Sequence, residues 1–282
     1  MRSGGFTLIE LSIVLVIIGL IVGGILVGQD LIKAAEVRAQ ISQIEKYNSA
    51  VNTFRAKFGA LPGDMPVATA NQYGFTVGSG CSGSGNGTRD GDGLIEGYPG
   101  EPIVQGEGET ELFWQDLSSS AAGSLIEGNF PNSGGPAVAC NTSSQAMTTT
   151  PGSTYIGDYL PAAKIGHGNF VAVYTYAGAN WYTLGAVNAI NTAGYMGATA
   201  SIPVIQAYNM DKKTDDGLPT SGAVQAYYVN GTGSWPWVPA ASANAAADST
   251  STCYNTTSNA YSVSSLANYG TGGNCGLSFR FQ

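Results

Sequence analysis

The chain begins with a long apolar run that contains no charged side chain between residues 11 and 29. As an α-helix this run spans about 28 Å, close to the hydrocarbon thickness of a bilayer, which is about 30 Å. The pattern therefore predicts a transmembrane helix over residues 11–29. One carboxylate, Glu10, stands at the edge of this helix. An acid in a membrane segment is costly, so Glu10 is a candidate functional residue.

Residues 37–58 keep the helical period but are apolar on one side only. The apolar positions recur at spacings of four and three residues, with Asn48 as the polar exception: Val37, Ile41, Ile44, Val51, Phe54 and Phe58. This spacing places the side chains on one face of a helix, which must be buried against another part of the protein. Gly59 and Pro62 then end the pattern. We expect one continuous helix over residues 6–58.

Beyond residue 170 the pattern changes to the alternation that is typical of strands. FVAVYTY and WYTLGAV surround a short turn and predict a hairpin over residues 170–187. Further strands are expected at 203–210, 223–229 and 277–282. A sheet built in this way is antiparallel, because short turns join neighbouring strands.

The segment between the helix and the hairpin, residues 59–165, shows little periodicity. It contains one short helix near LFWQDLSSSAAGSLI, preceded by acidic residues that favour a helix N-terminus. The sequence therefore predicts an α+β fold. A long N-terminal helix packs on an antiparallel β-sheet, and a large loop-rich insertion lies within a globular domain of residues 59–282.

The balance of charge limits the classes of partner. The chain has 282 residues, 11% of them charged, and a formal net charge of −8. After Lys57 the basic residues are few and scattered: Arg89, Lys164, Lys212, Lys213 and Arg280. Without a basic stripe to follow phosphates, we expect no binding to nucleic acid. An acidic surface instead suits solubility or the binding of divalent cations.

One acidic stretch is a candidate metal site. The segment GNGTRDGDGLIEG contains Asp90, Asp92 and Glu96, separated by glycines. Short Asp-Gly repeats can wrap carboxylate and carbonyl oxygens around a hard cation, so we expect Ca²⁺ as the candidate ligand. The spacing does not match an EF-hand loop. The alternative is a solvated, acidic, glycine-rich turn.

The four cysteines and the single histidine favour a structural role over a catalytic one. Cys81, Cys140, Cys253 and Cys275 form no CxxC pair, and an even count in a Gly/Ser/Thr-rich exported domain favours two disulfides over four buried thiols. The sequence leaves three connectivities open. No nucleophile and orienting acid can be assigned to His167. We therefore expect a protein that is not an enzyme.

The N-terminus itself carries a family resemblance. GGFTLIELSIVLVIIGLIVGG resembles the processing signature of type IV pilins and of type II secretion pseudopilins. The resemblance implies that residues 1–5 are a leader peptide, which a prepilin peptidase removes between Gly5 and Phe6. It also implies methylation of the new N-terminus at Phe6 and an assembly role for Glu10. A secretory signal peptide, the alternative, has a shorter apolar region that is followed by its cleavage site.

The resemblance extends to fold, location and function. It implies a pilin-like subunit of a type II secretion filament, anchored in the bacterial inner membrane by one span, with residues 59–282 in the periplasm or in a filament. Its partners would be the prepilin peptidase, other pilin or pseudopilin subunits, and the inner-membrane assembly platform. The alternatives are a type IV pilus minor pilin, a competence pseudopilin, or a membrane-anchored binding protein that does not polymerise.

The resemblance also bears on the disulfides. Many pilins have a C-terminal loop closed by a disulfide, which implies a bond between Cys253 and Cys275. Cys81 and Cys140 would then form the second pair. A bond that closes a loop of about 22 residues is worth about 3 kcal/mol in the chain-entropy model.

Overall fold

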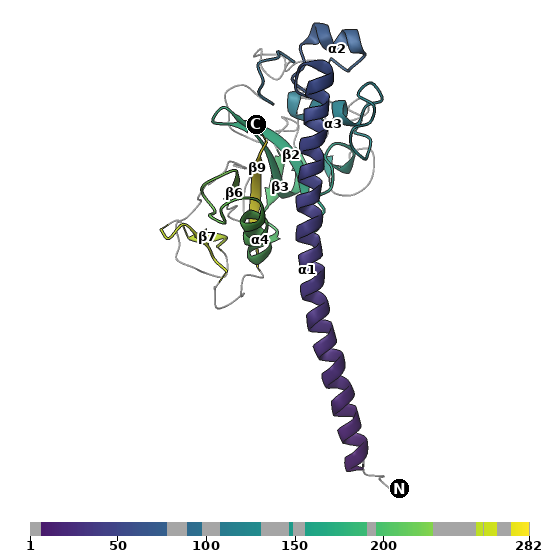
Figure 1. The fold of residues 1–282 in the computed structure, drawn as a ribbon, viewed down its shortest axis with the longest axis vertical. Coiled ribbons are helices and arrows are strands. Elements are labelled where there is room, and N and C mark those ends of the chain that lie inside the picture. The colour runs from purple at the N-terminus through teal and green to yellow at the C-terminus, as the bar shows by residue number, and fades with distance from the viewer. Residues whose placement is uncertain are drawn as a thin grey trace.

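A single helix, α1 (Leu8–Phe58), runs through 51 residues and forms the long axis of the molecule (Figure 1). Thr7 caps its N-terminus, and Gly59 ends it in the left-handed conformation at φ +75°, which glycine adopts without steric cost. The structure is a computed structural model that describes residues 7–77, 89–97, 108–130, 147–148, 156–190, 196–227, 252–255, 257–263 and 272–281. The predicted continuous helix is confirmed over Leu8–Phe58.

The two halves of α1 have different surroundings. The N-terminal half projects from the globular domain, and the C-terminal half packs along it (Figure 1). The apolar face predicted for the second half is the buried face, and its members are buried except for half-buried Ile41. Phe54 is completely buried and packs against Phe58 and Phe75, with ring centroids 4.6 Å and 5.4 Å away.

Two glutamines on this face fix α1 to the segment before the sheet. Gln43 donates from Nε2 to the carbonyl of Ala162 at 2.9 Å, and its Oε1 accepts the Lys164 N–H at 3.0 Å. Oε1 of Gln40 accepts the Ile165 N–H at 3.0 Å. These bonds satisfy backbone groups of a segment without regular structure, which could otherwise pair only with water.

The main sheet is antiparallel and centres on two long strands, β3 (Ala179–Ile190) and β9 (Gly273–Arg280). β2 (Phe170–Tyr176) forms the predicted hairpin with β3, from Phe170 opposite Gly185 to Tyr176 opposite Ala179. β6 (Val224–Tyr227) pairs with β9.

Short strands complete this sheet, and a small ribbon lies beside it. β1 (Met147–Thr148) and β4 (Met196–Thr199) pair with the C-terminal half of β3. β5 (Ile202–Pro203) pairs with β9. β7 (Tyr254–Asn255) and β8 (Ala260–Tyr261) form a separate two-stranded ribbon.

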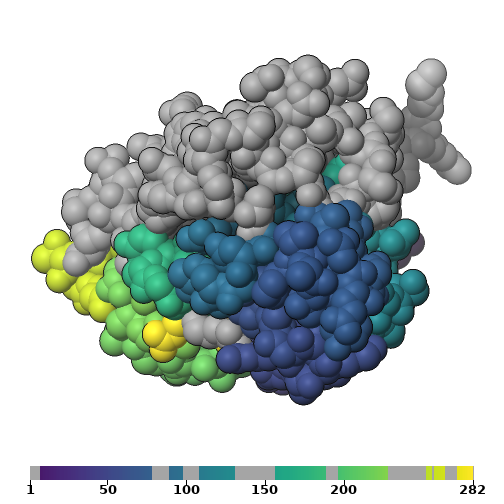
Figure 2. All heavy atoms as spheres, turned by 90° about the horizontal axis from the view of Figure 1, so that it is seen from above, coloured from purple at the N-terminus to yellow at the C-terminus, as the bar shows by residue number. Residues whose placement is uncertain are grey.

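Three α-helices besides α1 and one 3₁₀ turn occur in the described part of the chain: α2 (Val67–Tyr73), α3 (Glu109–Ser118), α4 (Val204–Thr214) and η1 (Ile156–Asp158). The helix expected near 112–126 is α3, which begins three residues earlier. From above, the end of α1 and α2 form one side of the domain, and the segment from β4 to β6 lies on another (Figure 2).

The strand expected at 203–210 is wrong, because residues 204–210 begin α4 and only Pro203 belongs to a strand, β5. VIQAYNM alternates well enough to suggest a strand, but its buried apolar residues are Val204, Ala207 and Met210, at helical spacing of three. The packing of this face against α1 and β9 outweighs the local preference of the sequence.

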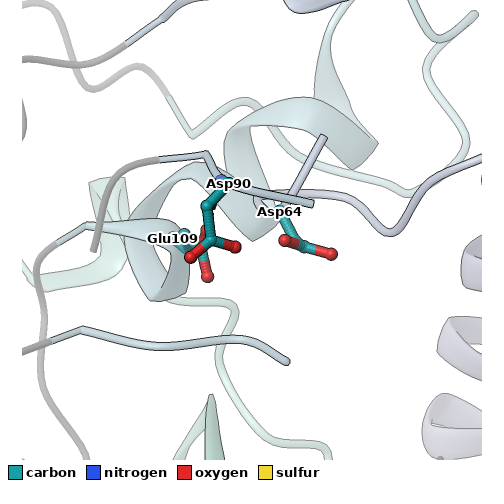
Figure 3. A group of neighbouring side chains, drawn as sticks. All are labelled: Asp64, Asp90 and Glu109. Atoms are coloured by element: carbon teal, nitrogen blue, oxygen red, sulfur yellow. Dashed lines mark hydrogen bonds between the residues drawn. The ribbon is translucent and has the colours of Figure 1, made fainter. Parts of the chain in front are cut away.

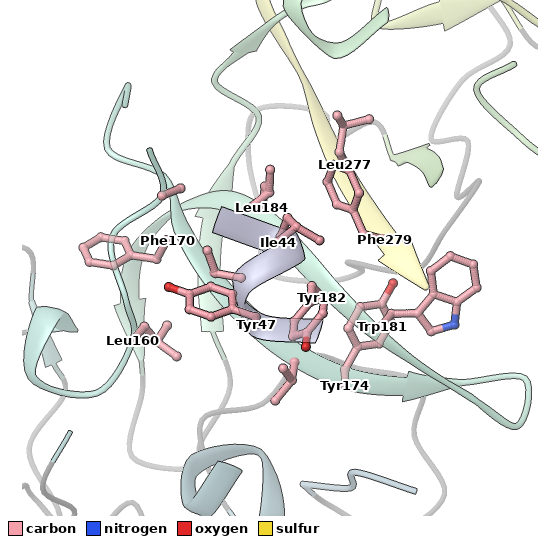
Figure 4. Close-up of a cluster of buried hydrophobic side chains, with 14 of the residues drawn as sticks. Ile44, Tyr47, Leu160, Phe170, Tyr174, Trp181, Tyr182, Leu184, Leu277 and Phe279 are labelled. Carbon is pink, nitrogen blue, oxygen red and sulfur yellow. The ribbon is translucent and has the colours of Figure 1, made fainter. Parts of the chain in front are cut away.

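The core lies between α1 and the sheet. Tyr47 of α1 lies among side chains of the domain, between Phe170 and Tyr182 (Figure 4). Its ring lies 4.9 Å from that of Trp114 on α3 and 6.0 Å from that of Tyr182. The arrangement is therefore α+β with a long N-terminal helix on an antiparallel sheet, which is consistent with a pilin-like fold.

Candidate functional site

The first turn of α1 holds the Glu10 carboxylate against the helix terminus. Oε2 of Glu10 accepts from the Thr7 N–H and from the Thr7 hydroxyl, both at 2.8 Å. The Glu10 N–H donates in return to Oγ1 of Thr7 at 3.3 Å, which completes a capping box. Gly5 and Phe6, the predicted processing residues, lie outside the described residues.

The projecting half of α1 offers an apolar surface on every side. Its large apolar side chains, from Leu8 to Ile32, are each at least 50% exposed. By length and composition α1 can cross a membrane. A surface of this extent is not stable in water, so it must meet lipid or other helices. The capping box places Glu10 at the outer end of this surface.

A second candidate site is a cluster of three carboxylates at the other end of the molecule. Asp64 follows α1, Asp90 belongs to the segment 89–97, and Glu109 is the first residue of α3. One carboxylate oxygen from each lies within 4.8 Å of the others. Figure 3 shows the three side chains converging from separate parts of the chain. Asp64 and Glu109 are buried, and Asp90 is exposed.

The segment 89–97 wraps around the two buried acids. The Gly91 and Gly93 N–H groups donate to the two oxygens of Asp64 at 2.8 Å and 2.9 Å. The N–H groups of Asp90 and Glu96 donate to Glu109 at 3.3 Å and 3.0 Å. Gly91 has φ +81°, and a Cβ there would meet the Pro66 ring at 2.6 Å.

Burial and like charge raise the pKa values of these acids. The pKa of Glu109 rises to about 9, mainly through burial and further through the charges of Asp64 and Asp90. The pKa of Asp64 rises to about 6 through burial, with Asp92 and Asp90 adding to the shift. Burial and the same two aspartates also raise the pKa of Glu96. For Asp64 and Glu109, backbone hydrogen bonds oppose the rise in pKa but do not cancel it.

The nearest arginine in the sequence does not neutralise the cluster. Arg89 forms a buried, bidentate ion pair with Asp116, with nitrogen–oxygen distances of 2.6 Å and 2.8 Å. Asp116 also accepts the Gly63 N–H at 2.8 Å. The ion pair ties α3 to the segment 89–97, and the Gly63 bond ties α3 to the segment that follows α1. The charge of the Arg89 guanidinium is therefore paired with Asp116 and not with the acids of the cluster.

The geometry of the cluster suits a hard divalent cation. Ca²⁺ binds carboxylate oxygens at about 2.3–2.6 Å, so two of its ligands lie at most about 5 Å apart. The oxygens of Asp64, Asp90 and Glu109 meet this limit. Of the predicted calcium ligands, only Asp90 joins the cluster. Asp92 and Glu96 are outside it, and Asp92 instead accepts the Leu94 N–H at 2.8 Å.

Sequence reasoning missed Asp64 and Glu109 as members of this cluster. They stand 26 residues before and 19 residues after Asp90, so a search for local Asp-Gly spacing does not find them. Asp64 in FGALPGD directly follows the end of the helix, but nothing in that motif specifies its partner.

A second acidic group, Asp211, Asp215 and Asp216, also brings three carboxylate oxygens within 4.8 Å of one another, and its carboxylates accept hydrogen bonds as those of the first cluster do. Asp211 accepts from the Tyr261 hydroxyl at 2.7 Å and from the Gly217 N–H at 3.0 Å. Asp215 accepts the Val224 N–H at 2.9 Å, and Asp216 accepts the Leu218 N–H at 2.8 Å. Gly217, which follows Asp216, has a φ of +75°.

The C-terminal disulfide is present. Cys253 and Cys275 are bonded across a sequence separation of 22, with their Cα atoms 5.0 Å apart. The bond joins the segment of β7 to β9 and is completely buried. Cys81 and Cys140 lie outside the described residues, so their pairing stays a prediction.

The fold and the exposed helix define the class: an α+β protein with an N-terminal helix suited to membrane anchoring. Residues 1–26 match the family model of the prokaryotic N-terminal methylation motif. The chain therefore carries the signature of type IV pilins and pseudopilins. No curated protein and no solved structure matches the chain.

Proposed function

We propose that the protein is a structural subunit of a type II secretion filament, a pseudopilin, and not an enzyme. In this proposal a prepilin peptidase cuts the chain between Gly5 and Phe6, and the new N-terminus is methylated. Before assembly the subunit is anchored in the inner membrane, with residues 59–282 in the periplasm. The assembly platform then moves it into a filament with other pilin or pseudopilin subunits, through α1.

The observation that carries the proposal is the position of an acid on an otherwise apolar, exposed helix. Within the described residues, both hydrogen bonds of the Glu10 side chain go to Thr7, and both use Oε2. Oε1 remains available to a cation. The amine at Phe6 of a neighbouring subunit supplies one, since methylation leaves that amine basic. Pairing these charges in an apolar filament core also sets the axial register of each added subunit.

The test compares Glu10→Ala with Glu45→Ala, a matched loss of one carboxylate from an exposed position of the same helix. Each variant is produced beside wild-type subunits, and incorporation into filaments is measured by cross-linking and sedimentation. We expect Glu10→Ala to be absent from filaments and Glu45→Ala to be incorporated. Normal assembly of Glu10→Ala would contradict the proposal and favour an anchored binding protein that does not polymerise.

Processing is tested separately by mass spectrometry of the mature N-terminus. We expect a chain that begins with a methylated Phe6. A variant that blocks cleavage, Gly5→Val, should retain residues 1–5. A wild-type chain that keeps its leader, or that is cut after residue 29, would contradict the proposed processing.

A further inference from the structure

A cavity of about 400 Å³ is lined by residues of α1 and α4. These two helices lie side by side at the end of the domain where the projecting half of α1 leaves it (Figure 1). One face of each helix lines it, with residues three or four apart. The lining combines apolar surface from Ala34, Val37 and Ile205 with five polar or charged side chains, those of Asp30, Lys33, Gln206, Asn209 and Lys213.

The cavity begins where the apolar surface of α1 ends. Asp30 and Lys33 are the first charged residues after Glu10. Between them, Leu31 and Ile32 are 67% and 60% exposed and are the last large apolar side chains of the projecting half. In a subunit anchored by this half, the cavity therefore lies at the level of the lipid headgroups.

A buried polar atom on the cavity lining has no partner within the described residues. Gln206 is only 2% exposed, and its Nε2 donates to the Glu36 carboxylate at 2.8 Å. That bond fixes the orientation of the amide, because the reversed amide would place oxygen against oxygen. Oε1 of Gln206 is left without a hydrogen bond. A buried acceptor of this kind is unfavourable unless an N–H or O–H donor reaches it.

The charges around the cavity are of both signs. Lys33 on α1 and Lys213 in the last turn of α4 provide two ammonium groups, and Asp30 provides a carboxylate. Glu36 lies at the lining amide of Gln206. The two ammonium groups suit a phosphate, and the carboxylate with the free amide oxygen suits an amine that has N–H donors.

We propose that this cavity binds the headgroup of an amine-bearing phospholipid, phosphatidylethanolamine. The phosphate lies between Lys33 and Lys213, and the ammonium group donates to Oε1 of Gln206 and faces Asp30. The inference rests on the proposed membrane anchoring of α1. It goes beyond that anchoring, because an apolar helix alone has no preference between headgroups.

The test uses the full-length protein in nanodiscs that contain equal amounts of phosphatidylethanolamine, phosphatidylcholine and phosphatidylglycerol. Lipids retained after release are identified by native mass spectrometry. We expect phosphatidylethanolamine to be retained about tenfold over phosphatidylcholine, whose quaternary ammonium has no N–H, and over phosphatidylglycerol, which has no amine. Equal retention of the three lipids would overturn the proposal.

Two variants of equal net charge provide the control. We expect Lys33→Gln/Lys213→Gln to lose the preference, and Lys46→Gln/Lys164→Gln, which removes two exposed lysines elsewhere, to keep it. Unchanged retention in the first variant would also overturn the proposal. So would displacement of the lipid by inorganic phosphate, which would make the occupant a free anion. A chain that fails to enter nanodiscs contradicts the membrane anchoring itself.

Discussion

Glu109 shows how position changes the chemistry of an ordinary residue. In solution a glutamate is ionised at neutral pH, but here burial beside Asp64 and Asp90 raises the pKa to about 9. The folded state then binds the Glu109 proton more tightly than the unfolded state does. The stability from this residue is complete below its ordinary pKa of 4.5 and is lost as the pH rises towards 9. The raised pKa of Asp64 acts in the same direction between 3.8 and about 6.

The first prediction at this scale concerns Glu109→Gln in the absence of divalent cations. Glutamine resembles the protonated acid, so the variant should be more stable than the wild type at pH 8, by on the order of 1–3 kcal/mol, and no more stable at pH 4. Urea unfolding of the full-length protein, followed by tryptophan fluorescence, measures the difference. Glu127→Gln, at a side chain that is 90% exposed, is the control and should change little. A variant less stable than wild type at pH 8 would contradict the raised pKa.

The second prediction concerns Ca²⁺. At pH 7.5 a cation held by the three carboxylates favours their ionised forms, so Ca²⁺ should raise the melting temperature and EGTA should reverse the rise. Asp64→Asn should abolish the response. Asp92→Asn should retain it, because Asp92 lies outside the cluster and its Oδ1 accepts the Leu94 N–H. If Asp92→Asn abolished the response and Asp64→Asn retained it, the calcium ligands would be those expected from the local sequence. A wild type whose melting temperature does not respond to Ca²⁺ would rule out a stabilising calcium site.

At the scale of elements, α1 performs two tasks in one helix. Its first half is apolar and exposed apart from Glu10 in the first turn, and its second half buries one face. The buried face packs against the domain and stabilises it, since helix stability in proteins comes mainly from tertiary packing. The exposed half contributes nothing to that packing and is free to contact lipid or neighbouring helices.

This division gives the third prediction. Phe54→Ala removes a completely buried ring from the second half and should lower the unfolding free energy of the domain by about 3–5 kcal/mol. Leu26→Ala, in the exposed half, should change it by less than about 0.5 kcal/mol. Urea titration of the full-length protein in detergent compares the two. Equal effects would mean that the projecting half packs on the domain after all.

Across the whole molecule, the two ends have separate roles. The projecting, apolar half of α1 has Glu10 at its outer end (Figure 1). The cluster of Asp64, Asp90 and Glu109 lies beyond the opposite end of α1, close to α3 (Figure 3). The Cys253–Cys275 bond ties the C-terminal segments to β9, which contributes to the centre of the sheet. In the proposed pseudopilin, this separation allows the projecting half of α1 to move from the membrane into a filament while the domain stays folded.

The fourth prediction concerns this covalent tie. Cys253→Ala/Cys275→Ala should lower the unfolding free energy by about 2–4 kcal/mol, because the bond restricts the unfolded chain. Peptide mapping of the wild type without reductant should recover the Cys253–Cys275 peptide and, as the remaining pair, Cys81 with Cys140. A peptide that joins Cys81 to Cys253 would contradict both the structure and the predicted pairing.

The sequence by itself determined the features that depend on local period and motif. The length of α1, its apolar first half and buried second face, the β2–β3 hairpin and the N-terminal signature could all be inferred from neighbouring residues. Each follows from short-range physics, because a helical or strand period and a processing motif are complete within a few turns or a few residues.

Only the tertiary structure decided which distant residues meet. Residues 204–210 became a helix because their face packs on α1 and β9. Asp64 and Glu109 meet Asp90 because α3 lies beside the end of α1, and the Arg89–Asp116 pair holds the segment 89–97 against α3. The cavity between α1 and α4 likewise unites residues more than 150 positions apart. Such contacts depend on the free energy of packing the whole chain, which no local pattern records.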